Sequence, residues 1–300
     1  MLGRPEDPER RRRDNNEKMG TPPQKYFCAT RNLVVNRQAI LSAKMREGEQ
    51  RVSAKRFAEI DLVRGIAVVM MLVYHLAWDL NYFGHYRANL TTGNWFLFQR
   101  LTATLFVFVV GISLWLSYTL RGHRHFTPYL LRGGQLLGWG CLITLVTRLF
   151  LQEGTVLFGI LHLIGFTVIL AYPFLRLGSA NLLTVFLFFA AGSYLARSPV
   201  SLPFLSWLGF KPPPPVYMVD FFPIYPWFGI ALAGVAAGSF LYPNGRRRLP
   251  VPSLSLRPLW WLELLGRRSL SIYLLHQPVF FGLLFLLKAF SQLVAYAQGN

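Results

Sequence analysis

Residues 61–79 read DLVRGIAVVMMLVYHLAWD and place two carboxyl groups, an arginine and a histidine in a strongly apolar stretch. In a helix of 3.6 residues per turn, Arg64 and His75 lie three turns apart on nearly the same face, and Asp79 follows His75 by one turn. Ionisable groups inside a membrane span are costly and normally face a protein interior or a cavity. Asp61, Arg64, His75 and Asp79 are therefore predicted to form a functional site on a membrane helix.

Uncharged runs that are long enough to cross a hydrocarbon core recur along the rest of the chain. A soluble fold would have to bury about half of the chain as helices that are apolar all round. The sequence therefore predicts an all-α fold, a polytopic transmembrane helix bundle of about seven spans. These spans are expected at roughly 60–82, 96–120, 129–151, 155–175, 178–196, 222–242 and 269–290. Residues 257–266, which are too short to span, are expected to form an interfacial helix.

The net charge of +18 is distributed as the positive-inside rule requires. Lys and Arg concentrate in residues 1–56 and in segments that share their side of the membrane when the N-terminus is inside. This pattern predicts a multi-pass protein of the plasma (inner) membrane that binds anionic membrane lipids and no nucleic acid. Residues 1–55 are expected to be a disordered basic cytoplasmic tail, and residues 56–295 the transmembrane domain. The four prolines at 212–215 are expected to form an extended cap on the outer surface.

Cofactor motifs are missing from the sequence. Cys28 and Cys141 give neither a disulfide framework nor a metal motif. The sequence also has no Ser-His-Asp elbow, no phosphate-binding loop and no Cys/His metal spacing. We therefore expect no metal site and no permanently bound cofactor.

A second polar stripe lies on the last predicted span. Tyr273, His276 and Gln277 fall at three- and four-residue steps on an otherwise apolar helix, which favours a role in binding a substrate or donor. His162 stands between two glycines in the motif FGILHLIG, inside the fourth predicted span. Catalysis and an interhelical hydrogen bond explain His162 equally well.

Two polar residues at the predicted outer face have simpler interpretations. His85 follows the first span in a short polar loop, where a lone histidine is usually solvated. Asp220 precedes the sixth span, and we expect it to cap that helix or to pair with Arg87 or Arg100.

Four ordered motifs resemble one enzyme family. The run RFAEIDLVRGIAVVMMLVYHLAWDLNYFG resembles the opening helix of the heparan-alpha-glucosaminide N-acetyltransferase catalytic-domain family. Its later helices are similar to FGILHLIG, DFFPIYPWFGIALAGVAAG and LGRRSLSIYLLHQPV. The spacing of Arg64 and His75 is also similar to the Arg-x10-His signature of acyltransferase-3-like membrane O-acyltransferases, a related group.

The resemblance implies transfer of an acetyl or acyl group from acyl-CoA, with acetyl-CoA as co-substrate, to a glycan or glycolipid acceptor. In the O-acyltransferase branch the matching histidine is His75, with Asp79 placed to orient it. In the heparan-enzyme branch the histidine regarded as catalytic follows the first span, where His85 stands. Both histidines stay candidates for the general base, and Arg64 with Asp61 is expected near the donor.

Two other function classes fit the same pattern. A transporter or proton-coupled carrier could use the Asp/Arg/His stripe as a relay, and uptake without a covalent product would identify it. A non-catalytic membrane subunit would co-purify with one partner and tolerate substitution of Arg64 and His75. The pattern is also compatible with a homo-oligomer.

Overall fold

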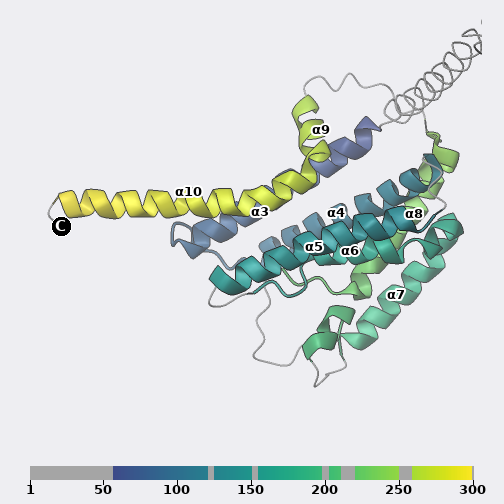
Figure 1. Cartoon of the computed structure of the whole chain (residues 1–300), viewed down its shortest axis with the longest axis horizontal. Coiled ribbons are helices and arrows are strands. Elements are labelled where there is room, and N and C mark those ends of the chain that lie inside the picture. Colours follow the sequence, from purple (N-terminus) through teal and green to yellow (C-terminus); the bar gives the residue numbers. More distant parts are fainter. Residues whose placement is uncertain are drawn as a thin grey trace, which may run out of the picture. The chain divides into compact units, whose positions relative to one another are not determined.

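The computed structural model describes residues 57–120, 125–150, 155–197, 203–210, 220–249 and 259–298. Every regular element in these ranges is a helix (Figure 1). This confirms the all-α, polytopic fold class. The expected tail at 1–55 and the proline cap at 212–215 lie outside the described residues.

Eight α-helices and three short 3-10 helices follow one another along the described chain. The 3-10 helices are η1 (Pro173–Ala180), η2 (Pro203–Leu208) and η3 (Pro243–Gly245). The α-helices are α3 (Ala58–Tyr82), α4 (Gly93–Leu120), α5 (Thr127–Phe150), α6 (Ile160–Leu170), α7 (Asn181–Leu195), α8 (Ile224–Leu241), α9 (Trp260–Arg267) and α10 (Ser269–Ala297).

Six helical segments, rather than the seven expected, are long and apolar enough to cross a membrane. They are α3, α4, α5, the η1–α7 segment, α8 and α10. The expected fourth span, 155–175, contains only the 11 residues of α6. At about 1.5 Å per residue such a helix is far shorter than the roughly 30 Å hydrocarbon core. Extended backbone at Gly159 precedes α6, and Pro173 starts the 3-10 turn that follows it.

α6 nevertheless returns the chain along α5. The Thr144 hydroxyl on α5 donates a 2.6 Å hydrogen bond to the carbonyl of Val156, just before α6. At the other end of the pair, a Cβ on Gly133 of α5 would lie 2.4 Å from the side chain of Ile169. The two helices are therefore antiparallel.

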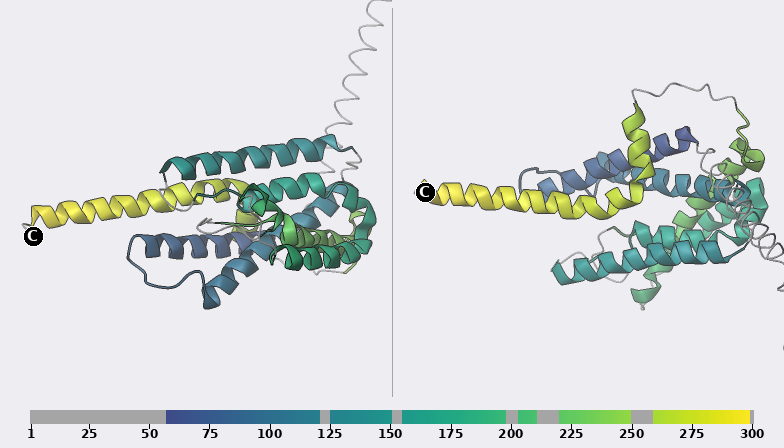
Figure 2. Two further views of the ribbon diagram at one scale, coloured as in Figure 1. Left: turned by 90° about the horizontal axis from the view of Figure 1, so that it is seen from below. Right: turned by 45° about the horizontal axis from the view of Figure 1, so that its top comes forward.

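α3 and α10 run in the same direction. His75 of α3 lies beside His276 of α10, and further along the same helices Tyr82 lies beside Phe281. The first and last of the long helices are thus parallel. Figures 1 and 2 show α10 running alongside α3 and continuing past its end.

Two pairs of glycines allow helices to cross with their backbones in contact. A Cβ on Gly111 of α4 would lie 2.0 Å from the carbonyl oxygen of Ala231 on α8, close to Gly234. A Cβ on Gly266 of α9 would likewise meet the backbone of Asp61 on α3. Small residues at such crossings are typical of membrane helices, where van der Waals packing drives association. The second crossing fixes α9, the helix expected at 257–266, against α3.

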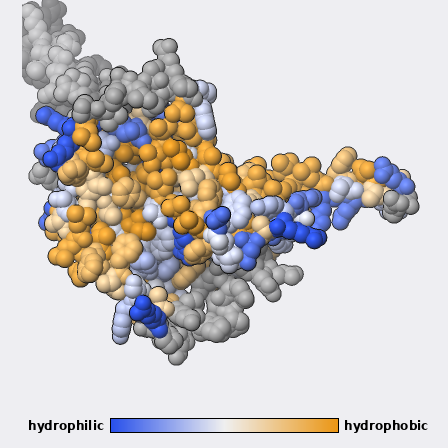
Figure 3. All heavy atoms as spheres, turned by 180° about the vertical axis from the view of Figure 1, so that it is seen from behind, coloured by the Kyte–Doolittle hydropathy of each residue, from blue (hydrophilic) through white to orange (hydrophobic). Residues whose placement is uncertain are grey.

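Large apolar side chains cover much of the described surface, as a lipid environment requires. Figure 3 shows hydrophobic side chains over most of one face and along the projecting part of α10. On α10 the most exposed of these side chains include Leu275, Val279, Phe285, Leu286, Phe290 and Leu293. The chain therefore presents to its surroundings the surface of a multi-pass membrane protein.

Candidate functional site between helices α3 and α10

Four of the predicted site residues meet where α10 packs on α3, at a place we call the α3–α10 seam. The seam consists of His75 and Asp79 from α3 and His276 and Gln277 from α10. The two imidazole rings pack edge to face, with their centroids 4.7 Å apart. The two stripes that the sequence placed on separate helices therefore form one cluster.

Asp79 is paired with Gln277 on α10 rather than with His75 on its own helix. The Gln277 amide donates a 2.7 Å hydrogen bond to Oδ1 of Asp79. The sequence predicted that Asp79 would instead accept a hydrogen bond from His75, four residues earlier. Only 2% of Asp79 is exposed, and its Oδ2 has no hydrogen-bond partner within the described ranges. The carboxylate thus ties α10 to α3 and leaves His75 without the partner expected for it.

The ring of His276 has a defined orientation. Its Nδ1 lies 2.7 Å from the carbonyl oxygen of Tyr273, one turn earlier on α10. Its Nε2 is buried and has no partner among the residues that the structure describes. The side-chain oxygen of Gln277 is likewise buried and has no hydrogen-bond partner among these residues. Buried polar atoms without partners are rare in folded proteins, and each of them calls for an explanation.

Tyr273 connects the seam to the start of α6. Its hydroxyl lies 3.5 Å from Oδ2 of Asp220, and the same oxygen accepts a 3.2 Å hydrogen bond from the backbone N–H of Ile160. Asp220 therefore sits at the N-terminus of α6, where the helix dipole favours an acid, rather than capping α8 or pairing with an arginine as expected. Burial raises the pKa of the Asp220 carboxyl to about 6, although both hydrogen bonds lower it.

His162 lies on α6, close to the helix N-terminus that Asp220 contacts. Its Nδ1 accepts a 3.3 Å hydrogen bond from the backbone N–H of Gly159, and its ring stacks on Phe158. A Cβ on Gly140 of α5 would lie 3.0 Å from the imidazole. The glycine therefore makes room for the ring, and His162 caps α6 while packing against α5. This hydrogen bond lies within the start of α6 and is not the interhelical bond that was one of the two interpretations of His162.

Arg64 and Asp61 lie at the other end of α3 and join three helices. The Arg64 guanidinium donates 2.8 Å hydrogen bonds to Asp61 and to the hydroxyl of Ser113 on α4. It also lies 3.5 Å from the carbonyl oxygen of Gly266 on α9, while Arg267 pairs with Asp61 at 3.5 Å. Arg64 and Asp61 are thus brought together as predicted, at a joint of α3, α4 and α9 that is separate from the seam.

His85 is not part of the seam. It follows Gly84, which has a positive φ of 81°, in the exposed turn after α3. Its backbone N–H donates a 2.8 Å hydrogen bond to the carbonyl of Leu80. The turn fixes the backbone and leaves the imidazole exposed to the surroundings.

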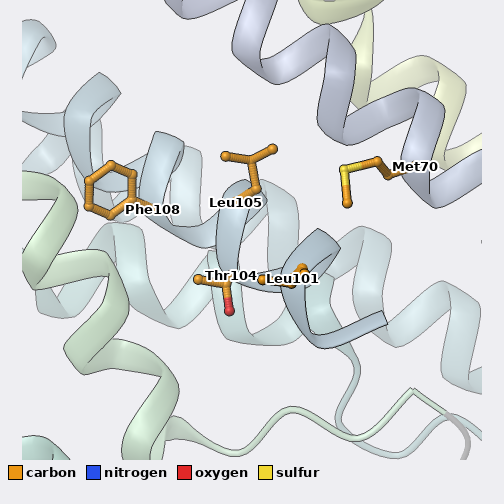
Figure 4. A pocket seen from close by; sticks show the side chains of 5 residues that line it. All are labelled: Met70, Leu101, Thr104, Leu105 and Phe108. Carbon is orange, nitrogen blue, oxygen red and sulfur yellow. The ribbon is translucent and has the colours of Figure 1, made fainter. Parts of the chain in front are cut away.

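An apolar hollow of about 350 Å³ opens between α3 and α4, and none of the predicted site residues lines it (Figure 4). It is lined by Met70, Leu101, Thr104, Leu105 and Phe108. This lining suits a hydrocarbon chain and offers a polar substrate only the Thr104 hydroxyl.

Glu59 and Ser113 pair with distant residues that the sequence did not indicate. Glu59 forms a bidentate pair with Arg247 and accepts a 3.0 Å hydrogen bond from the hydroxyl of Tyr242. Ser113, the partner of Arg64, is a single hydroxyl in an apolar helix. The polarity of Glu59 and Ser113 was visible in the sequence, but their partners are far away along the chain. Among the described residues, no group of three or more His, Cys, Asp or Glu side chains could hold a metal ion.

Comparison with known proteins identifies the family. The model of the family described as heparan-alpha-glucosaminide N-acetyltransferase, catalytic, matches residues 56–278, more than half of the chain. The chain belongs to this family. The resemblance seen in the four sequence motifs is thereby confirmed. No curated protein and no solved structure matches the chain.

Membership in the heparan-alpha-glucosaminide N-acetyltransferase catalytic family implies a membrane acetyltransferase. The matched range begins just before α3 and ends at Pro278, so it includes both walls of the α3–α10 seam. The acetyltransferase family and the six long apolar helices together describe a multi-pass membrane enzyme.

Proposed function

We propose that this protein transfers an acetyl group from acetyl-CoA to a hydroxyl or amine of a sugar-like acceptor, either a glycan or a glycolipid, at the α3–α10 seam. The observation that carries the proposal is the pair formed by His75 and His276, whose rings lie 4.7 Å apart inside the family-matched region. A positioned imidazole is the commonest general base in proteins, and acetyl transfer needs one to take the proton from the attacking group.

The basic end of α9 supports the donor half of the proposal. Arg267 and Arg268 are exposed where α9 ends and α10 begins. Arg267 also pairs with Asp61 and Glu263, but 44% of its side chain is exposed, against 22% for Arg64. Arginine binds phosphate in a fork geometry that suits the phosphates of coenzyme A. Because the Arg64 guanidinium is engaged with Asp61 and Ser113, we assign it the role of holding α9 against α3 beside this surface.

The proposed topology follows from the charge distribution. Residues 1–55 would be a cytoplasmic tail and residues 56–295 the transmembrane domain, with the N-terminus on the cytoplasmic side of the plasma membrane. The end of α3 that carries Arg64 then lies on the cytoplasmic side, where acetyl-CoA is made, and His75 lies toward the outer side. Arg64 and His75 are separated by about 16 Å along the helix, since each residue adds about 1.5 Å. A donor that reaches inward from the arginines with its acetyl arm can bridge that distance.

The donor site can be tested without knowledge of the acceptor. Binding of acetyl-CoA to the purified protein in lipid nanodiscs would be titrated for the wild type and for the double variant Arg267→Ala/Arg268→Ala. We expect saturable binding that weakens about tenfold in the double variant, since two charge-assisted contacts are lost. Arg197→Ala removes an exposed arginine elsewhere and should leave binding unchanged.

Transfer itself would be followed with acetyl-labelled donor and three acceptor classes: an amino sugar, a sugar that offers only hydroxyl groups, and a glycolipid in the nanodisc. Labelled product from any of these identifies the acceptor chemistry. Absence of saturable binding at near-millimolar acetyl-CoA would refute this donor. Binding without transfer to any class would refute a sugar-like acceptor.

A further inference from the structure

His276 has only one protonation pattern that fits its surroundings. Its Nδ1 lies 2.7 Å from the carbonyl oxygen of Tyr273, and a carbonyl oxygen only accepts hydrogen bonds. The proton of the neutral ring is therefore on Nδ1, and Nε2 carries a lone pair. A doubly protonated ring would bury an N–H that has no hydrogen-bond acceptor among the described residues, which is costly.

The lone pair of His276 points to the place where a substrate proton would be accepted. Nε2 is at the far end of the ring from the α10 backbone. It is buried and has no hydrogen-bond donor within the described parts of the chain. A buried acceptor of this kind is satisfied only when a donor arrives, and the O–H or N–H of an acetyl acceptor is such a donor.

His75, the residue that the sequence favoured, lacks this orientation. The carboxylate that would set its tautomer accepts its hydrogen bond from Gln277 instead. Without that contact nothing in the seam selects which nitrogen of His75 carries the proton. His75 is half-buried, and its ring packs against the ring of His276, whose orientation is fixed by Tyr273.

We propose that His276, with its Nε2 lone pair, is the general base for acetyl transfer, and that His75 lines the approach to it. The inference rests on the acetyltransferase function proposed above. As the acceptor attacks the thioester carbonyl, Nε2 takes the proton from its O–H or N–H. The tetrahedral intermediate then collapses, the carbon–sulfur bond breaks, and the coenzyme A thiolate takes the same proton from Nε2. The products are the acetylated acceptor and free coenzyme A, and His276 returns to its starting form.

Two neighbours act as positioning residues in this arrangement. The carbonyl of Tyr273 holds the ring through Nδ1, as the backbone or carboxylate partner of a catalytic histidine commonly does. The hydrogen bond from Gln277 to Asp79 fixes the rotation of α10 relative to α3. Together these two contacts orient the His276 ring so that Nε2 faces the seam.

The test compares three histidine variants in nanodiscs: His276→Gln, His75→Gln and His125→Gln. His125 is exposed before α5 and serves as the matched control. We expect His276→Gln to lower the acetyl-transfer rate by about 10²- to 10⁴-fold, the usual contribution of a general base. His75→Gln should lower the rate by no more than about tenfold, since loss of one packed ring disturbs geometry rather than proton transfer. Acetyl-CoA binding should stay within about twofold in all three, which shows that each variant is folded.

A second variant separates a chemical role from a structural one. His276→Ala leaves space for imidazole, which diffuses into membranes, and added imidazole should restore transfer to His276→Ala but not to Asp79→Ala. In the wild type, ¹⁵N NMR of labelled histidine should show the Nδ1–H tautomer for His276.

The role of His276 and the proposed acetyl transfer can be refuted separately. Rapid transfer by His276→Gln, or an Nε2–H tautomer in the NMR spectrum, would overturn the role of His276 while leaving acetyl transfer intact. A wild-type protein that transfers no acetyl group would instead overturn the proposed function, and the role of His276 with it.

Discussion

Gln277 on α10 and Asp79 on α3 are joined by a 2.7 Å hydrogen bond, although 198 residues separate them along the chain. This bond connects the first long helix with the last, beside the two histidines. Replacing Gln277 by Ala leaves both oxygens of a buried carboxylate without partners, since Oδ2 already has none in the described structure. We expect a loss of about 1–3 kcal/mol in stability, measured by thermal unfolding in detergent. Asp79→Asn keeps the acceptor and should cost less; an equal loss in both variants would contradict this explanation.

The crossing of α4 and α8 depends on Gly111. A methyl group there would lie 2.0 Å from the carbonyl oxygen of Ala231, and a backbone atom cannot rotate away as a flexible side chain can. Gly111→Ala should therefore force the two helices apart and cost about 1–3 kcal/mol or more. The control is Gly138→Ala on α5, where a Cβ meets nothing within 4 Å. That variant should be neutral or slightly stabilising, since Ala favours helix by up to about 1 kcal/mol. Similar unfolding temperatures for the two variants would refute the close crossing.

The Asp220 carboxyl predicts a specific pH dependence. Its pKa is raised by burial from 3.8 to about 6 in the folded protein, so the folded state holds the proton more tightly than the unfolded state. Its stabilising contribution is complete below pH 3.8 and is lost as the pH rises through about 6. The unfolding temperature should therefore fall between pH 5 and pH 7.5. The difference should disappear in Asp220→Asn, and a slope that persists in that variant would assign it to other groups.

The ion pair of Glu59 with Arg247 should make a small, salt-dependent contribution. The pair is bidentate, with contacts of 2.8 and 2.7 Å, but 39% of the Arg247 side chain is exposed. Exposed pairs contribute up to about 1 kcal/mol and are screened by salt. Arg247→Ala should lower stability by roughly 0.5–1 kcal/mol at low ionic strength and by less in high salt. Arg246→Ala, at the exposed neighbouring position, should change neither value.

Much of the fold could be predicted because membrane helices follow directly from apolar length. The ranges expected for α3, α4, α5, α8 and α10 agree with the structure to within a few residues, apart from the additional C-terminal turns of α10. The fourth span was wrong because mean hydropathy does not register the extended backbone at Gly159 or the turn at Pro173. Both features shorten α6 without changing how apolar the segment is.

The helix faces that carry the polar residues could be predicted from the sequence, but the pairing between helices could not. Helical spacing correctly placed His75 with Asp79, and Tyr273 with His276 and Gln277, on common faces. Nothing in a single sequence shows which way two helices are rotated toward each other, since packing sets that rotation. The partner of Asp79 was therefore sought on its own helix, four residues away, instead of on α10. The same limit concealed Ser113 as the partner of Arg64.

The 198-residue separation of Asp79 and Gln277 has a consequence for biosynthesis. At roughly 5–20 residues per second, a ribosome needs about 10–40 s to make the intervening chain. During that time Asp79 has entered the membrane on α3. Gln277, whose amide donates a hydrogen bond to the Asp79 carboxylate in the folded protein, has not yet been synthesised. The nascent protein must keep that carboxyl group protonated, hydrated or shielded by the insertion machinery until α10 arrives. Interrupted synthesis would leave a polar group unmatched in the bilayer, the kind of defect by which membrane quality control recognises an incomplete chain.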